Sequence, residues 1–163
     1  MPVLPLFSLS SRATPQGMAR ISAQLESTGG EPLAGAIVRV HPAGERAWFG
    51  LADGRGVVSV LFPYPRPPAD EFLSPPASGG TSHASQHWDD VGLGVYWNAV
   101  PASDHPDLCD LLSQLDEAPA AVLAGGSPDA ELTEVRLDYG VPLDLRTVPL
   151  SVLIVEAGSP PSP

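Results

Sequence analysis

The stretch from Ile21 to Phe62 places the strongest constraint on the fold, because apolar and polar residues alternate along it between turn-forming residues. A period of two is typical of strands that bury one face. The apolar sets are Ile21, Ala23 and Leu25, then Ala36, Val38 and Val40, and then Val58, Val60 and Phe62. Gly-Gly-Glu-Pro at 29–32 and Asp-Gly-Arg-Gly at 53–56 predict turns between these strands, and the second turn is expected to close a hairpin. The pattern predicts a mainly β protein.

The composition favours a turn-rich β-sandwich of one domain. The 163 residues include 16 glycines and 20 prolines, too many for a helical protein. We divide the chain into an extended N-terminal arm at 1–17, a sandwich domain at 18–157 and a Pro/Ser tail at 158–163. A Pro-rich insertion at 63–90 interrupts the domain. So long an irregular connection is typical of a functional segment, a partner contact or disorder.

The second half predicts further strands and one short helix. The strand at 91–100 has Val91, Leu93, Val95 and Trp97 on one face, while Gly92 and Gly94 leave the other face bare. A leucine stripe predicts a helix at about 105–116, and Cys109 beside the stripe is expected to be buried. The other strands are expected at 119–124, 131–139, 141–146 and 148–157. The last is apolar on both faces and is therefore expected to be central in its sheet.

One motif in the first half resembles a known family. G-E-P-L-A-G-A-I-V-R-V, followed by A-D-G-R-G-V-V-S-V, is similar to the carboxypeptidase regulatory-like, or transthyretin-like, β-sandwich family. The residues that match its pattern are Gly30, Pro32, Leu33, Gly35, Ala36, Val38, Asp53 and Gly56. The resemblance covers about a quarter of the chain and implies an Ig-like/transthyretin-like antiparallel β-sandwich. The structural turn residues that it implies are Gly30, Pro32, Gly35, Asp53 and Gly56.

Acidic residues are concentrated in the second half. Residues 1–81 carry six acids and six arginines, whereas residues 82–163 carry thirteen acids and two arginines, so the net charge is −11, and no lysine is present. Such a surface repels phosphate backbones, so we expect no nucleic-acid partner. No apolar run approaches the roughly 18 residues of a membrane span. With a single cysteine, the chain is expected to be cytoplasmic. The acidity either provides solubility or offers a surface to a basic partner.

Motifs for catalysis or metal binding are scarce. The sequence has no G-x-S-x-G, Walker loop, C-x-x-C or H-E-x-x-H motif. His83 and His87 have the spacing of a ligand pair, and Asp89 could join them, but their flanks are loop-like and we interpret them as ordinary loop polarity. The Y-R-G-S signature of transthyretin-like hydroxyisourate hydrolases and the H-x-H pair of intradiol dioxygenases are both absent. We therefore expect no enzyme and no cofactor.

Apolar residues in the arm and the insertion predict contacts with other protein subunits. Their prolines bar a helix, yet their large apolar side chains need a surface to lie against. The candidate partner-binding residues are Leu4, Leu6, Phe7, Tyr64, Phe72 and Trp88. The second half, with D-L-L-S-Q-L-D-E-A-P and L-D-Y-G-V-P-L-D-L-R-T, is similar to small sandwich proteins of phage-tail-like contractile injection particles. This similarity implies a non-catalytic structural subunit of a larger assembly.

A carbohydrate- or peptide-binding module is the alternative function. Its aromatic platform would come from Trp48, Trp88, Tyr96 and Trp97. Of these, Trp97 is predicted to lie in the core, because it shares the apolar face of its strand. The alternative gains weight if the arm is an edge strand of its own sandwich.

Overall fold

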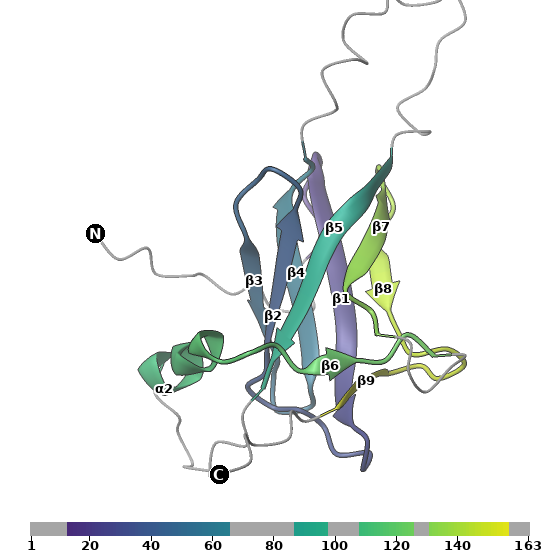
Figure 1. Cartoon of the computed structure of the whole chain (residues 1–163). Helices are drawn as coiled ribbons and strands as arrows, with labels where there is room; N and C mark the ends of the chain where they lie inside the picture. The colour runs from purple at the N-terminus through teal and green to yellow at the C-terminus, as the bar shows by residue number, and fades with distance from the viewer. Residues whose placement is uncertain (1–12, 66–86, 98–107, 126–130, 157–163) are drawn as a thin grey trace, which may run out of the picture.

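The computed structural model of the chain describes residues 13–65, 87–97, 108–125 and 131–156. These residues form two β-sheets packed face to face, with a short helix beside them (Figure 1). The mainly β sandwich predicted from the alternating residues is confirmed. No helix within these four ranges is long and apolar enough to cross a membrane.

The first sheet has five strands and the second has four. In the first, the order is β4-β1-β9-β6, and β8 also pairs with β1; in the second, it is β3-β2-β5-β7. The strands are β1 Met18–Ser27, β2 Ile37–Pro42, β3 Trp48–Leu51, β4 Val57–Pro63, β5 His87–Tyr96, β6 Ala121–Val122, β7 Glu134–Asp138, β8 Leu143–Leu145 and β9 Leu153–Glu156. The helical elements are α2 Leu108–Ser113 and a 3-10 turn, η2, at Gln114–Asp116.

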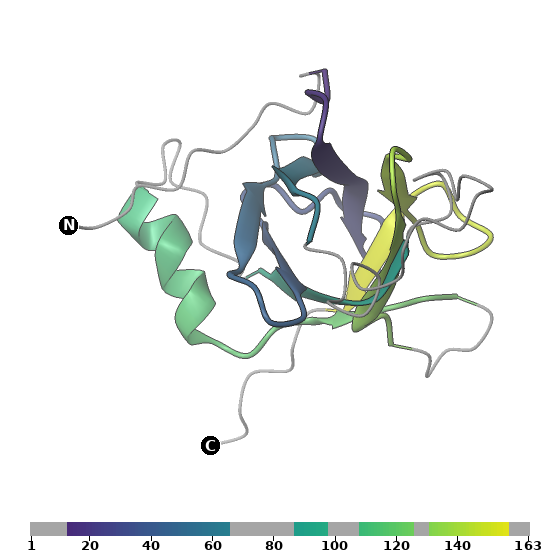
Figure 2. The same ribbon diagram turned by 90° about the horizontal axis from the view of Figure 1, so that it is seen from above.

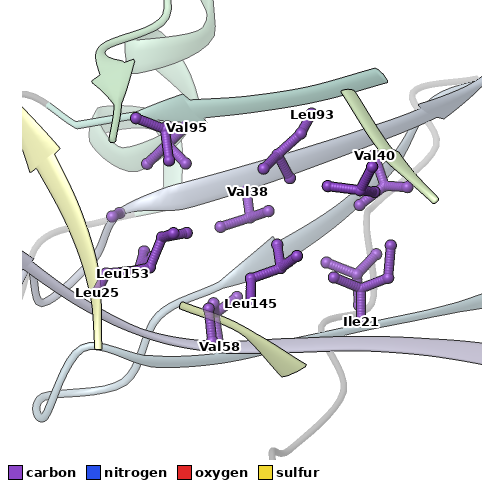
Figure 3. Close-up of a cluster of buried hydrophobic side chains, with 14 of the residues drawn as sticks. Ile21, Leu25, Val38, Val40, Val58, Leu93, Val95, Leu145 and Leu153 are labelled. Atoms are coloured by element: carbon purple, nitrogen blue, oxygen red, sulfur yellow. The ribbon is translucent and has the colours of Figure 1, made fainter. Parts of the chain in front are cut away.

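The inward-facing residues of both sheets form one core, as the alternation predicts. Ile21 and Leu25 of β1 face Val38 and Val40 of β2 and Val95 of β5, and all five are almost fully buried (Figure 3). The same cluster includes Val58, Val60 and Phe62 of β4. Burial of such side chains contributes roughly 1.5–3 kcal/mol each. The core therefore follows directly from the period of two in the sequence.

The sandwich is not wholly antiparallel, because β1 pairs in parallel with two short strands. Residues 21–23 lie beside β8, and residues 25–27 lie beside β9. The two short strands thus follow one another along the same edge of β1, whose other edge pairs antiparallel with β4. The other strand pairs are antiparallel, in keeping with the antiparallel sandwich that the resemblance implies.

The turn at 53–56 does not close a hairpin, contrary to the prediction. The strand before it, β3, pairs with β2 in the second sheet, whereas the strand after it, β4, pairs with β1 in the first. The turn therefore carries the chain from one sheet to the other. Asp53 stabilises it, because its Oδ1 accepts hydrogen bonds from the backbone N–H groups of Arg55 and Val57, both at 2.9 Å.

The other predicted turn residues lie close to this crossing. Gly30, Gly35 and Gly56 have φ values of +80°, +77° and +76°, a region in which glycine is favoured. Pro32 is exposed and forms an isolated bridge with Glu26 of β1. The connection between β1 and β2 and the crossing to β4 therefore meet at one end of β1.

The helix is shorter in the described residues than the predicted span of 105–116, and residues 105–107 lie outside them. It lies to one side of the sandwich, not between the sheets (Figure 2). Gln114, which is buried, donates through Nε2 to the carbonyl oxygens of Gly35 at 3.2 Å and Leu111 at 2.9 Å. Cys109 is exposed, so the prediction of a buried cysteine is wrong. The contacts to the sandwich are made through Leu111 and Gln114, roughly opposite Cys109 on the helix.

The last strand is also shorter than predicted. β9 begins at Leu153, and the preceding turn leaves Val148 and Leu150 60% and 45% exposed. The prediction of a strand over 148–157 is therefore wrong for its first five residues. Pro149 cannot donate to a strand ladder, and Thr147 closes the turn instead, because its N–H donates to the Val152 carbonyl at 2.9 Å. β9 does lie between β1 and β6, as expected of a central strand.

Replacing Thr147 by valine should lower the free energy of unfolding by about 2 kcal/mol. The Thr147 hydroxyl donates to the Leu123 carbonyl at 2.6 Å and accepts from the Ile154 N–H at 2.8 Å. Valine keeps the shape but leaves both backbone groups without this partner. Urea denaturation measures the change, and the same substitution at exposed Thr28 is the matched control, expected within about 0.5 kcal/mol of the parent. Equal values for both variants would contradict a stabilising role for the hydroxyl.

Candidate functional site

The outer face of the second sheet, turned toward the viewer in Figure 1, contains a depression over β5. Val91, Leu93 and Val95 of β5 point into the core, so Gly92 and Gly94 lie on the outer face. Their cross-strand neighbours on β2 are His41 and Arg39, respectively. Two residues without side chains therefore lie beside two long basic side chains.

This depression, which we call the outer-face pocket, has a volume of about 200 Å³. Its lining residues are Arg39, His41, Gly92, Leu93, Gly94, Tyr96, Pro119 and Thr133. Tyr96 is 6% exposed, and its hydroxyl accepts a hydrogen bond from Arg39 Nη1 at 3.2 Å. Because Tyr96 is held by its burial, this bond fixes one end of the Arg39 guanidinium at the rim of the pocket.

The opposite wall of the outer-face pocket is formed by Thr133, which comes just before β7, and Pro119, which comes just before β6. β7 pairs with β5 only as far as Gly92, and the Leu93 N–H then donates to the Thr133 carbonyl at 2.8 Å. Two residues later, the Ala120 N–H donates to the Val95 carbonyl at 2.7 Å, just before the chain enters β6 in the first sheet. These bonds place Thr133 and Pro119 along the edge of β5.

Gly94 is not required by the backbone. Its φ lies outside the left-handed region, and a Cβ there would lie 3.4 Å from Tyr96 Cε2 and 3.7 Å from Pro119 Cβ, both ordinary contacts. Glycine within a strand costs roughly 0.5–1 kcal/mol relative to alanine. The fold has room for a methyl group at Gly94 but carries none. Another molecule can therefore approach the strand backbone closely at this position.

The charge of the outer-face pocket is opposite to that of the whole chain. Arg39 and His41 line it, and no carboxylate from the described part of the chain does. Glu134 lies across from Gly92 on β7 but is not among the lining residues. Among the described residues, Arg39 forms no ion pair with an aspartate or glutamate. A half-buried arginine without a carboxylate, in a chain of net charge −11, favours an anionic ligand.

Tyr64 and Trp88, which stay predicted partner-binding residues, belong to a half-buried aromatic cluster at the end of the sandwich where β4 ends and β5 begins. Their rings stack with centroids 5.4 Å apart, and Tyr139 lies 4.7 Å from Tyr64. The Tyr64 hydroxyl accepts a hydrogen bond from the Gly140 N–H at 2.7 Å. Both rings also pack on the core. These contacts give Tyr64 and Trp88 a structural role in closing the core.

Two of the three metal-ligand candidates lie beside this cluster. His87 Nε2 is 3.4 Å from Asp89 Oδ2, while Arg136 Nε is 3.9 Å from Asp89 Oδ1 and 3.1 Å from Asp138 Oδ1. An irregularity in the β5–β7 register brings Asp89 opposite Arg136. His83 lies outside the described residues, which contain no group of three or more side chains able to hold a metal ion. Arg136 supplies the positive charge next to the carboxylates of Asp89 and Asp138.

The four aromatic residues of the alternative binding platform do not come together. Tyr96 lines the outer-face pocket, whereas Trp88 stacks on Tyr64. Trp48 and Trp97 pack partly buried against the core, and the Arg46 guanidinium covers the Trp48 ring at 4.0 Å from its centroid. The remaining partner-binding candidates, Leu4, Leu6, Phe7 and Phe72, lie outside the described residues.

Sequence reasoning identified the bare face at Gly92 and Gly94 and named Tyr96 as a candidate binding aromatic, but it missed Arg39, His41, Thr133 and Pro119. Arg39 and His41 alternate with inward-facing Val38 and Val40, a signal that they lie on the outer face of their strand. Their position beside the glycines requires the β2–β5 register. Thr133 and Pro119 carry no signal of their own, because only the crossing between the sheets brings them to β5.

No family model, curated protein or solved structure matches the chain. The outer-face pocket and its surroundings therefore provide the basis for a function.

Proposed function

We propose that the chain is a non-catalytic interaction subunit that binds another protein through the outer face of its second sheet. The outer-face pocket carries this proposal: a small basic depression on an acidic chain, floored by Gly92 and by Gly94, of which the fold does not require Gly94. Backbone that can be approached closely, beside a fixed guanidinium, suits an inserted side chain of a partner.

The size of the outer-face pocket favours a protein partner over a free small molecule. Pockets that enclose drug-sized ligands measure about 300–1,000 Å³. A volume of about 200 Å³ is smaller and suits a single side chain. The carbohydrate-binding alternative loses support for a separate reason, because Trp48 and Trp88 present their rings to Arg46 and Tyr64 rather than to a shared surface.

The assembly that the sequence resemblance implies is a phage-tail-like contractile injection particle, in which the chain would be a structural component made in the cytoplasm. The arm at 1–17 and the acidic second half would supply further contacts to other subunits. Both described sheets are built entirely from residues 18–156. Residues 13–17, the described part of the arm, form no strand of these sheets.

Size-exclusion chromatography with mass detection tests the proposal on the full chain in extracts of its native cells. We expect the chain to elute far above its monomer mass. Thr133→Trp, which places a bulky ring beside the outer-face pocket, should shift it toward the monomer without lowering Tm. The matched control is Thr28→Trp, in an exposed turn of the first half, which should elute like the parent. A parent chain at monomer mass in the extract would contradict the proposed function.

A further inference from the structure

We propose that the outer-face pocket recognises the carboxylate of an aspartate or glutamate side chain presented by the partner protein. This inference rests on the proposed function and names the chemistry that its site selects. The observations that carry it are the hydrogen bond that holds Arg39, a lining in which the described residues contribute no carboxylate, and the glycine floor.

The Arg39 guanidinium is held in a position in which it can bind an anion. One of its terminal nitrogens donates to the Tyr96 hydroxyl at 3.2 Å, which restricts the guanidinium before any ligand arrives. A guanidinium has five N–H donors in a planar fork, so donors remain for the two oxygens of a carboxylate. A fork held in place loses less side-chain entropy on binding than a free one.

The residues around the Arg39 guanidinium determine which ligand it can bind. The chain has 19 acidic residues and eight arginines, yet among the described residues no carboxylate lines the outer-face pocket. Glu134 stands outside the lining on β7, where it would repel a ligand placed too far toward that strand. Arg39 and His41 both lie on the β2 side of the pocket, and Arg39 carries the positive charge there. An incoming carboxylate is therefore directed toward the β2 side.

The floor fits a side chain that reaches in from an external backbone. Gly92 and Gly94 expose strand backbone between His41, Arg39 and the Tyr96 ring. A methyl group at Gly94 would fit against Tyr96 and Pro119 and would fill the floor without disturbing the fold. Gly94→Ala is therefore expected to change ligand binding without changing the stability of the fold.

The experiment selects short random peptides displayed on phage against the full-length chain and measures synthetic copies by fluorescence anisotropy. We expect selected peptides to share an aspartate or glutamate, and its replacement by asparagine or glutamine should weaken binding about tenfold or more. Arg39→Gln should weaken the parent peptide similarly, whereas Arg55→Gln, the same change in an exposed turn, should not. Gly94→Ala should weaken binding while leaving Tm unchanged or slightly raised.

The outcomes separate this inference from the proposed function. Selected peptides that lack an acidic residue, or that bind equally well after Arg39→Gln, would overturn the carboxylate site. Failure to select any peptide would also count against it. If the chain in native extract keeps its high mass after Arg39→Gln, the interaction subunit stands and the carboxylate site fails. If glutamate alone binds as tightly as the peptide, the ligand is a free small molecule and the partner-protein source is wrong.

Discussion

Replacing Gly56 by alanine is expected to lower the free energy of unfolding by about 3 kcal/mol, near the upper end of the effect of strain at a single backbone position. Gly56 has a φ of +76°, which side chains other than glycine rarely adopt. A methyl group there would also overlap the carbonyl oxygen of Leu25 and crowd the Leu33 N–H. The Leu25 N–H donates to the Gly56 carbonyl at 2.8 Å, so the overlap cannot be relieved without breaking a contact to β1.

Alanine at Gly54 is the matched control for this substitution. Gly54 belongs to the same turn, but its φ lies outside the left-handed region and a Cβ there would meet nothing within 4 Å. We expect its free energy of unfolding to stay within about 0.5 kcal/mol of the parent. Thermal and urea denaturation of the two variants measure the difference, with Gly56→Ala expected to melt roughly 6–12 °C below the parent. Equal stability of the two variants would show that the turn does not constrain the sandwich.

The contrast between these glycines shows what the sequence can predict about this fold. The D-x-x-G pattern marks Asp53 and Gly56 as a turn, and the side-chain bonds of Asp53 together with the φ of Gly56 give the physical reason. The alternating residues likewise predict which faces of β1, β2, β4 and β5 are buried. Both signals are local, because they depend on residues that are neighbours in the chain.

Strand pairing could not be predicted in the same way. Alternation fixes which face of a strand is buried but not which strand lies beside it. The turn at 53–56 therefore suggested a hairpin, although β3 and β4 belong to different sheets. The short strands β8 and β9 pair with β1 across more than a hundred residues of chain, and nothing local in either specifies a parallel partner.

The candidate site was predictable only in part for the same reason. Gly92 and Gly94 are visible in the sequence as a bare strand face. Arg39 becomes part of the site only through the pairing of β2 with β5. The site is completed by the buried Tyr96 and by the hydrogen bond from the Ala120 N–H to the Val95 carbonyl. Both depend on the long-range arrangement of the sheets.

At the other end of β5, Tyr64 and Trp88 were predicted to bind a partner because they are apolar and lie next to an irregular segment, and in the structure their rings pack on the core. Replacing Trp88 by alanine should lower the free energy of unfolding by about 3 kcal/mol, as expected for loss of a large ring from a core. Trp88 stacks on Tyr64 at an interplanar angle of 23° and packs on the core, so its removal opens one end of the sandwich. A residue that only contacted a partner would give an unchanged Tm and a loss of assembly.

Two variants make this Trp88 prediction sharper. Trp88→Phe keeps a ring for Tyr64 and removes an indole N–H that is buried without a hydrogen-bond partner among the described residues, so we expect it to destabilise less than alanine. Val141→Ala is the control at an apolar residue that is 55% exposed, and it should leave Tm nearly unchanged. Calorimetry orders the three variants. Should Trp88→Ala melt with the parent while its mass in native extract falls to that of the monomer, Trp88 binds a partner and the structural role assigned to the aromatic cluster is wrong.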